Sequence, residues 1–157
     1  MVHRPPGVRA ATETPLGPVW VAARDGAIVA SGWGSADTAP DDPLLKAALA
    51  QLAAYFEGGL AQFDLPLAHG RTGLQADVLD ALRAIPLGET RTYGALSRQV
   101  GAPAQAIGQA CGANPLPILI PCHRVLGATT LGGFSAPGGV ETKVWLLRHE
   151  GAAGLLI

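Results

Sequence analysis

The chain has 157 residues and a mass of 16.0 kDa, enough for one ordinary domain or for one domain with a small appendage. Its 11 basic and 12 acidic residues leave a net charge of −1, which excludes a histone-like polycation, an acidic tail protein and a chain disordered by its charge. No apolar run approaches the roughly 20 residues of a membrane span, and the N-terminus lacks an apolar signal sequence. Two cysteines do not form a disulfide framework, so we expect a cytoplasmic protein with reduced thiols.

The charge is unevenly distributed along the chain. Residues 1–70 carry four basic and seven acidic side chains, a net −3, whereas residues 71–157 carry seven basic and five acidic ones, a net +2. No acid occurs between positions 89 and 141, where Arg91, Arg98 and Arg124 lie. Such a segment can form a mildly positive surface that binds a polyanion, or it can be a buried stretch with few charges. The composition leaves both interpretations open.

The first predicted elements are a hairpin and a helix. Two short β-prone runs flank Asp25-Gly26, and Asp-Gly between such runs predicts a β-hairpin over residues 19–30. Asp42 and Pro43 supply the N-cap and first position of a helix whose apolar residues recur at helical spacing as far as Phe56. The stretch over residues 62–73 is predicted to be a linker.

The next predicted elements are helical. An apolar stripe predicts a helix over residues 74–85, followed by a short helix over residues 93–100 and a third over residues 103–112. Two short helices joined at a glycine, here Gly101, are typical of a helix-turn-helix, although other helical hairpins are commoner. The spacing alone leaves both possibilities open.

The predicted fold class is therefore α+β. A small N-terminal hairpin-and-helix domain, residues 1–70, supports a mainly helical C-terminal domain with a helix-turn-helix, residues 71–157. The third helix and its flanks consist mostly of small residues, which would let the backbone closely approach either another helix or a narrow groove: Ala102, Ala104, Ala106, Gly108, Ala110, Gly112 and Ala113.

A Cys-His pair follows a proline-punctuated segment that is too short and too interrupted for a long helix. The thiolate of Cys122 would be a good nucleophile, and the imidazole of His123 can accept the thiol proton. Neighbours in an extended chain point to opposite sides, so their contact requires a turn or a bridging water. The imidazole in turn needs an orienting carboxylate, and Glu150, at the end of a helical stretch over residues 144–149, is a candidate.

Structural alternatives apply to the same residues. A buried cysteine is usually inert filler, and His149 and Glu150 would then be ordinary surface residues at a helix end. Cys111 together with Cys122 and His123 suggests zinc, but the spacing matches no common zinc site and a fourth ligand is missing. We therefore predict no metal from this spacing.

The segment Pro121-Cys122-His123-Arg124-Val125, preceded by Asn114-Pro115 and Pro117-Ile118-Leu119-Ile120, resembles the active-site signature of the O6-alkylguanine-DNA alkyltransferases. The resemblance extends over about residues 74–151, through Gly88–Tyr93 and Lys143–Gly151. The N-terminal hairpin and helix fit the first domain of that family only loosely.

This resemblance implies DNA repair by direct damage reversal, the activity of a methylated-DNA–protein-cysteine S-methyltransferase. The helix-turn-helix would bind double-stranded DNA with its slim second helix in the minor groove, and the alkylated base would be flipped into a pocket. One alkyl group would move irreversibly from O6-alkylguanine, or from O4-alkylthymine, to Cys122, and the resemblance implies that no cofactor is needed. We expect a monomer, with cooperative binding along DNA left open, located at the nucleoid in a prokaryote.

The resemblance also assigns roles to individual residues. Cys122 is the acceptor, His123 the base acting through a water, and Glu150 the carboxylate that orients it. Tyr93 would donate a proton toward the leaving guanine, and Asn114 would support the active-site turn. The base pocket would be formed by the backbone at Cys122 and Val125 together with Phe134 and Ser135. The DNA surface would comprise Gln105, Ala102, Ala104, Ala106, Gly108, Arg91 and Arg124.

The chain departs from the family pattern at two places. Gln105 stands where the family has an arginine finger, so we expect modest, salt-sensitive DNA affinity. Phe134 replaces a tyrosine, and two apparent extra residues follow it. Two alternatives to a competent transferase stay open: an alkyltransferase-like protein that binds lesions without reacting, and a cysteine hydrolase built on Cys122 and His123.

Overall fold

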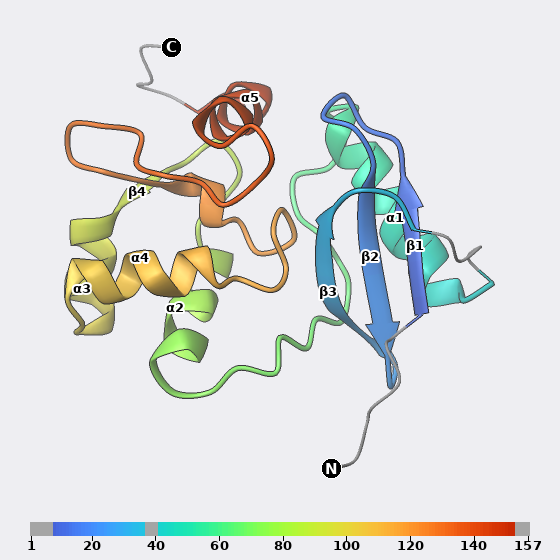
Figure 1. Ribbon diagram of the computed structural model, residues 1–157, viewed down its shortest axis with the longest axis horizontal. Helices are drawn as coiled ribbons and strands as arrows, with labels where there is room; N and C mark the ends of the chain where they lie inside the picture. Colours follow the sequence, from blue (N-terminus) through green and yellow to red (C-terminus); the bar gives the residue numbers. More distant parts are fainter. Residues whose placement is uncertain (1–7, 37–40, 153–157) are drawn as a thin grey trace. The chain divides into compact units, whose positions relative to one another are not determined.

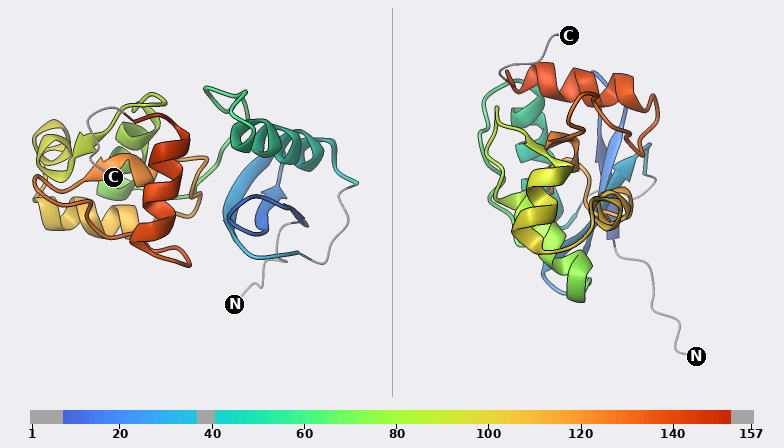
Figure 2. Two further views of the ribbon diagram at one scale, coloured as in Figure 1. Left: turned by 90° about the horizontal axis from the view of Figure 1, so that it is seen from above. Right: turned by 90° about the vertical axis from the view of Figure 1, so that its left-hand side faces the viewer.

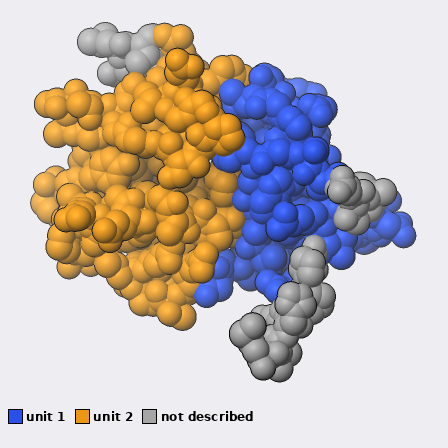
Figure 3. Space-filling model, in the orientation of Figure 1, with its two compact units in different colours: residues 1–70 blue, residues 71–157 orange. Residues whose placement is uncertain are grey.

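The computed structural model describes residues 8–36 and 41–152. The chain divides into two compact units, residues 1–70 and residues 71–157, coloured separately in Figure 3. The first is a small sheet with one helix and the second is mainly helical, so the predicted α+β class is confirmed. Within the described residues, no helix is both long and apolar enough to cross a bilayer.

The first unit is an antiparallel sheet covered by a helix (Figures 1 and 2). Its strands are β1 (Val8–Thr12), β2 (Val19–Arg24) and β3 (Ala27–Trp33), in that order across the sheet. Helix α1 (Pro43–Phe56) packs on the sheet with its apolar side buried. Because only one face of the helix meets the sheet, its apolar residues recur at helical spacing.

Local signals account for the hairpin and for the start of α1. Asp25 and Gly26 both have positive φ, at 53° and 78°, the conformation that a tight two-residue hairpin turn requires. The carboxylate of Asp42 accepts hydrogen bonds from the N–H groups of Leu44 at 2.7 Å and Leu45 at 3.2 Å, which caps the helix.

Two features of this unit differ from the sequence-based expectation. Strand β1 was not predicted, because its sequence Val-Arg-Ala-Ala-Thr has little β preference and the strand forms by pairing with β2. Part of the predicted linker belongs to the sheet unit. Leu67 lies in a parallel bridge with Ile28, whose N–H donates to the carbonyl of Pro66 at 2.8 Å.

The second unit is helical with one short pair of strands. Its elements, in chain order, are α2 (Gly73–Arg83), β4 (Arg91–Thr92), α3 (Tyr93–Val100), α4 (Ala104–Gly112), the 3-10 turn η1 (Cys122–Arg124), β5 (Val125–Leu126) and α5 (Val140–His149). Helix α5 begins one turn earlier than its apolar stretch indicated. Large apolar side chains from all four α-helices and the segment before η1 are fully buried in the core: Leu79, Leu82, Leu96, Ile107, Leu116, Ile120, Leu146 and Leu147.

Helices α3 and α4 pack together and are joined by a short turn, visible in Figure 1. The hydroxyl of Thr92 caps α3 by accepting from the N–H of Ala95 at 3.0 Å. Gly101 ends α3 in the left-handed region, with φ of 79°, and the Ser97 hydroxyl donates to the carbonyl of Ala102. These contacts set the geometry of the predicted helix-turn-helix.

The pairing of β4 with β5 is short and was not predicted. Arg91 pairs with Val125, and Thr92 with Leu126, in parallel. The pairing joins the start of α3 to the end of the Cys122 turn, although the two segments lie more than thirty positions apart in the chain. It therefore brings Tyr93, the first residue of α3, toward the candidate nucleophile.

Candidate active site

Cys122 lies in the 3-10 turn η1 after a tightly folded, buried segment. Its side chain is buried, and its N–H donates to the carbonyl of Ile120 at 2.8 Å. The Asn114 amide holds this segment by donating to the carbonyl of Ile120 at 2.9 Å and accepting from the N–H of Leu116 at 2.9 Å. Ile118 has a φ of 72°, a conformation that β-branched residues rarely adopt, so the surrounding contacts hold it in a tight reversal.

The surroundings of Cys122 both raise and lower the pKa of its thiol. Burial raises the pKa of Cys122, whereas a hydrogen bond from Asn114, the charge of Lys143 and a backbone hydrogen bond lower it. The position of Asn114 agrees with the role predicted for it in supporting the active-site turn. Pro121 interrupts a continuous helix here, and the Asn114 side chain satisfies the carbonyl of Ile120 and the N–H of Leu116.

His123 and Glu150 form a buried pair. Nε2 of His123 lies 2.7 Å from Oε2 of Glu150, and both side chains are fully buried. An ionised carboxylate only accepts hydrogen bonds, so Nε2 carries the proton that it shares with Glu150. Neutral His123 then has a free electron pair on Nδ1, an atom with no hydrogen-bond partner among the described residues. Burial lowers the pKa of His123 despite the hydrogen bond and charge of Glu150, which favours this neutral base.

Arg124 corrects the predicted DNA surface. Its Nε donates to Oε1 of Glu150 at 2.8 Å, and a second guanidinium nitrogen donates to Oε2 at 3.0 Å. The remaining nitrogen donates to the carbonyl of Ile85 at 2.7 Å, and Arg124 is 7% exposed. The prediction that Arg124 contacts DNA is therefore wrong, because its guanidinium is buried and occupied by Glu150 and Ile85, partners that lie 26 and 39 positions away in the chain.

Glu150 is the centre of this network. Burial alone would raise the pKa of its carboxyl, but hydrogen bonds from His123 and Arg124, with their charges, outweigh burial and lower the pKa to about 2. The carboxylate is thus ionised throughout the physiological range and orients both neighbours. This arrangement of Cys122, His123 and Glu150 matches the nucleophile, base and orienting carboxylate of nucleophilic catalysis.

Tyr93 and Cys111 are two further ionisable residues near Cys122. Burial raises the pKa of the Tyr93 phenol, and charges on Cys111 and Cys122 raise it further. Burial also raises the pKa of Cys111 to about 12, with a smaller contribution from Cys122. The side chain of Tyr93 closely approaches Gly132, where an added Cβ would stand 3.0 Å from the ring. The structure therefore gathers two thiols and a phenol at the loop after β5.

Lys143 belongs to the same cluster, and the sequence predicted no role for it. It is fully buried on α5, and its Nζ donates to the carbonyl of Val125 at 2.6 Å and of Gly133 at 3.2 Å. The signal available in the sequence was its place in the stretch Lys143–Gly151, over which the chain resembles the alkyltransferases, but lysine is seldom fully buried.

The predicted pocket residues lie on this loop and strand. Val125 is buried; its N–H donates to the carbonyl of Cys122, and its own carbonyl, bound by Lys143, retains a second lone pair for another donor. Phe134 is half-buried and Ser135 is exposed. The Ser135 hydroxyl lies at the last turn of α4, 3.5 Å from where a Cβ on Gly112 would stand.

The outward side of helix α4 carries small residues and two glutamines. Ala104, Gln105 and Gln109 are exposed, Ala102, Ala106 and Gly108 are partly exposed, and the buried residues of the helix are Ile107, Ala110 and Cys111. Arg91 is exposed but paired with Glu89 at 3.2 Å, so it is not the unopposed cation that the acid-free interval suggested. Arg98 is exposed and forms no ion pair within the described residues.

Both units match family models. Residues 73–152 match the description "6-O-methylguanine DNA methyltransferase, DNA binding domain", and residues 8–69 match "6-O-methylguanine DNA methyltransferase, ribonuclease-like domain". The chain belongs to the 6-O-methylguanine DNA methyltransferase family. The family resemblance inferred from the sequence is thus confirmed.

Relatives within this methyltransferase family support the same assignment. A methylated-DNA–protein-cysteine methyltransferase of Salmonella typhimurium is 53% identical over 105 residues, which are 64% of this chain and 60% of that protein. One from Methanosarcina acetivorans is 43% identical over 115 residues, 71% of this chain and 72% of that protein. The match thus spans about 60% of the length of the Salmonella relative.

Among solved structures, Mycobacterium tuberculosis OGT in complex with DNA has a TM-score of 0.81 and 38% identity. The alignment covers 91% of this chain and 92% of that one. The similarity therefore extends over both units and is not restricted to the Cys122 segment.

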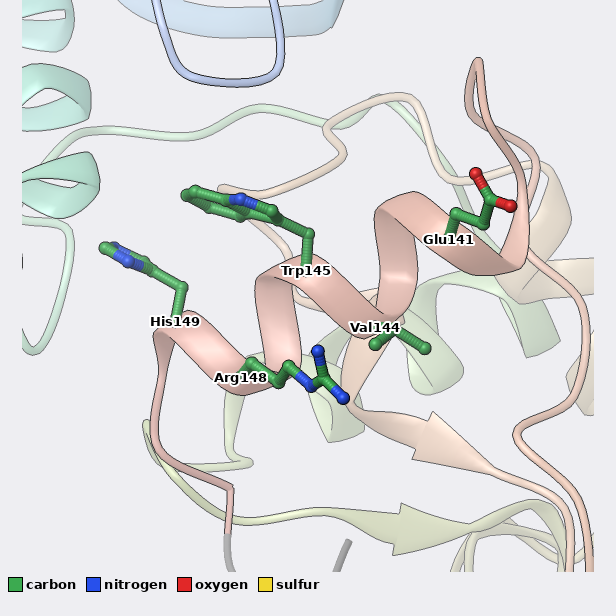
Figure 4. Close-up of a pocket in the computed structure, with 5 residues that line it drawn as sticks. All are labelled: Glu141, Val144, Trp145, Arg148 and His149. Atoms are coloured by element: carbon green, nitrogen blue, oxygen red, sulfur yellow. The ribbon is translucent and has the colours of Figure 1, made fainter. Parts of the chain in front are cut away.

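A separate depression lies on the outer side of α5, as Figure 4 shows. It has a volume of about 460 Å³ and is lined by Glu141, Val144, Trp145, Arg148 and His149. The rings of Trp145 and His149 stack with centroids 4.9 Å apart. The acceptor cysteine is not among the lining residues, so this depression is distinct from the methyltransferase site.

Proposed function

We propose that this protein repairs DNA by transferring the alkyl group of O6-alkylguanine to Cys122, once per molecule. The observation that carries the proposal is the buried network in which Glu150 orients His123 directly beside Cys122 in the chain. The names of the relatives, methylated-DNA–protein-cysteine methyltransferase, support the same reaction.

In the proposed reaction the Cys122 thiol gives its proton, through a bridging water, to Nδ1 of His123. The resulting thiolate attacks the alkyl carbon, a sulfur–carbon bond forms and the bond between carbon and O6 of guanine breaks. The leaving guanine takes a proton from the Tyr93 hydroxyl, and the phenolate regains one from the imidazolium. The products are unmodified guanine and an S-alkyl cysteine, so the balance requires no cofactor.

The hydrogen-bonding of His123 supports this direction of proton transfer. Nε2 is engaged with Glu150, which leaves Nδ1 as the accepting atom. The lowered pKa of His123 means that the imidazole is unprotonated before the reaction and can accept a proton.

We propose that the outward side of α4 enters the minor groove of duplex DNA and that Gln105 replaces the flipped base in the stack. The small residues of this side would allow the close approach, and Arg98 and Arg91 would lie toward the phosphates. Val125, Phe134 and Ser135 would then surround the flipped base. We propose that the protein acts as a monomer, and that O4-alkylthymine is a second substrate.

The proposed activity is tested by intact-mass measurement. Wild-type protein and the Cys122→Ala variant are incubated with a duplex that contains O6-methylguanine, with an undamaged duplex as control. The wild type should gain one methyl group per molecule and the variant none. Tight binding of the damaged duplex without any mass gain would instead identify a lesion-binding protein that does not react.

A further inference from the structure

The chain contains two lysines, and they lie in opposite environments. Lys46 is exposed on α1, whereas Lys143 is 0% exposed on α5. Within the described parts of the chain, Lys143 forms no ion pair with a carboxylate. A buried ammonium without a neutralising partner is costly, so its retention at this position calls for a function.

The hydrogen bonds of Lys143 join two segments of the proposed site. Nζ donates to the carbonyl of Val125, the residue whose N–H closes the Cys122 turn. It also donates to the carbonyl of Gly133, directly before Phe134 in the pocket loop. Nζ stands 5.9 Å from the centre of the Tyr93 ring. One side chain thus contacts the acceptor turn, the pocket loop and the proposed proton donor.

The ionisable neighbours of Lys143 can supply the missing negative charge. They are Tyr93 on α3, Cys111 on α4, and Cys122 and His123 on η1. Burial lowers the pKa of Lys143, and charges on Cys122 and Cys111 raise it. Of these neighbours, only Cys122 becomes an anion in the proposed reaction before the alkyl group moves. Because Nζ binds the carbonyl of Val125, whose N–H donates to the carbonyl of Cys122, the cation lies beside the turn that carries the reacting thiolate.

We propose that Lys143 is a positioning residue that holds the pocket loop against Val125 and presents a positive charge to the Cys122 sulfur as its proton leaves. This inference rests on the proposed function only for the identity of the alkyl donor. The effect on the sulfur holds for any electrophile that reaches Cys122.

The test compares Lys143→Met with Lys46→Met, the same substitution at the other lysine. The rate of methyl transfer from an O6-methylguanine duplex is measured between about pH 6 and about pH 9. In parallel, the rate at which iodoacetamide modifies Cys122 is followed by peptide mass. Lys143→Met should slow both reactions about ten-fold at neutral pH, the change expected when the thiol pKa rises by about one. Lys143→Arg should recover part of the rate.

The outcomes separate the inference from the proposed function. A shifted iodoacetamide profile in Lys143→Met, without methyl transfer by the wild type, would contradict the repair activity but retain the role of Lys143. A folded Lys143→Met protein with the wild-type pH profile in both reactions would overturn the inference. The Lys46→Met variant should match the wild type in both.

A measurement on the wild type covers the case in which Lys143→Met fails to fold. With lysine labelled by nitrogen-15, the two side-chain signals can be titrated by nuclear magnetic resonance before and after iodoacetamide alkylates Cys122. Alkylation removes the thiolate that supports the ammonium, so the pKa of Lys143 should fall while the titration of Lys46 stays the same. An unchanged Lys143 titration would overturn the charge coupling.

Discussion

The two units of the chain differ in whether their cores contain charged side chains. Among the described residues of the first unit, Ser31 is the only buried polar side chain, and the helix–sheet core is otherwise apolar. The second unit buries His123, Arg124, Lys143 and Glu150 beside the thiol of Cys122. Burying charge is unfavourable unless each group is paired. The comparison therefore indicates that the first unit is held together by apolar packing, whereas the second also depends on a paired, buried network of charges beside Cys122.

The largest effect is expected when the charge at the centre of the buried network of the second unit is removed. Glu150→Gln leaves the Arg124 guanidinium without a negative partner, and it leaves His123 with at most a neutral amide oxygen as its acceptor. We expect the free energy of unfolding to fall by about 3–5 kcal/mol and methyl transfer to slow by about 100-fold. Chemical denaturation and single-turnover kinetics measure the two effects.

Glu141→Gln is the matched control, because Glu141 is exposed on the same helix. It should leave both quantities close to those of the wild type. Equal losses in the two variants would show that the helix tolerates no change of charge and that the network has no special role.

The buried network also predicts how the stability of the protein changes as the pH falls. The pKa of Glu150 falls from its ordinary value of 4.5 to about 2, so its contribution of about 3 kcal/mol is present above about pH 4.5 and disappears as the pH falls toward about 2. The lowered pKa of His123 acts in the same direction, because stability is lost as the pH falls below 6.5 toward its folded-state pKa. Stability followed by circular dichroism should decrease with acid in both windows, and Glu150→Gln should remove the lower one.

A smaller effect is expected at the surface of the second unit. Gln105→Arg adds a charge to the exposed side of α4, so DNA affinity should rise and the slope of log affinity against log salt should steepen by about one phosphate contact. The control Gln62→Arg adds the same charge to an exposed position of the first unit. Fluorescence anisotropy with a labelled duplex measures both, and an equal gain in the two variants would argue against α4 as the DNA-binding helix.

The smallest effect is expected in the first unit. Asp42→Ala removes the cap of α1 and should destabilise the protein by about 1 kcal/mol. Methyl transfer per folded molecule should be unchanged. A large loss of transfer in this variant would show that the first unit contributes directly to the chemistry.

The elements that could be predicted most accurately are those whose limits are set by local residues. Helix α3 was predicted with its observed limits because Thr92 caps one end and Gly101 ends the other. The strand pair β4–β5 could not be predicted, since two-residue strands form only when distant segments meet. Cys122, His123 and Glu150 were singled out from the sequence by their chemistry, and the contact between His123 and Glu150 forms because tertiary packing brings the end of α5 to the Cys122 turn.

The charges were the least predictable part of the site. Arg124 and Lys143 look like ordinary surface cations in the sequence, where lysine and arginine are seldom fully buried. Their partners are Glu150 and the carbonyls of Val125 and Gly133, and tertiary packing alone creates these contacts. The acid-free interval accordingly contained one buried arginine, one paired arginine and one exposed arginine, a division that composition does not reveal.

The most direct test of the account is to locate the transferred group between the two buried thiols. After reaction with a duplex carrying O6-methylguanine, the protein is digested and the peptides that contain Cys111 and Cys122 are sequenced by tandem mass spectrometry. The account predicts one methyl group on Cys122, next to His123 and supported by Asn114, and none on Cys111. Methyl on Cys111, or on neither thiol, would contradict it.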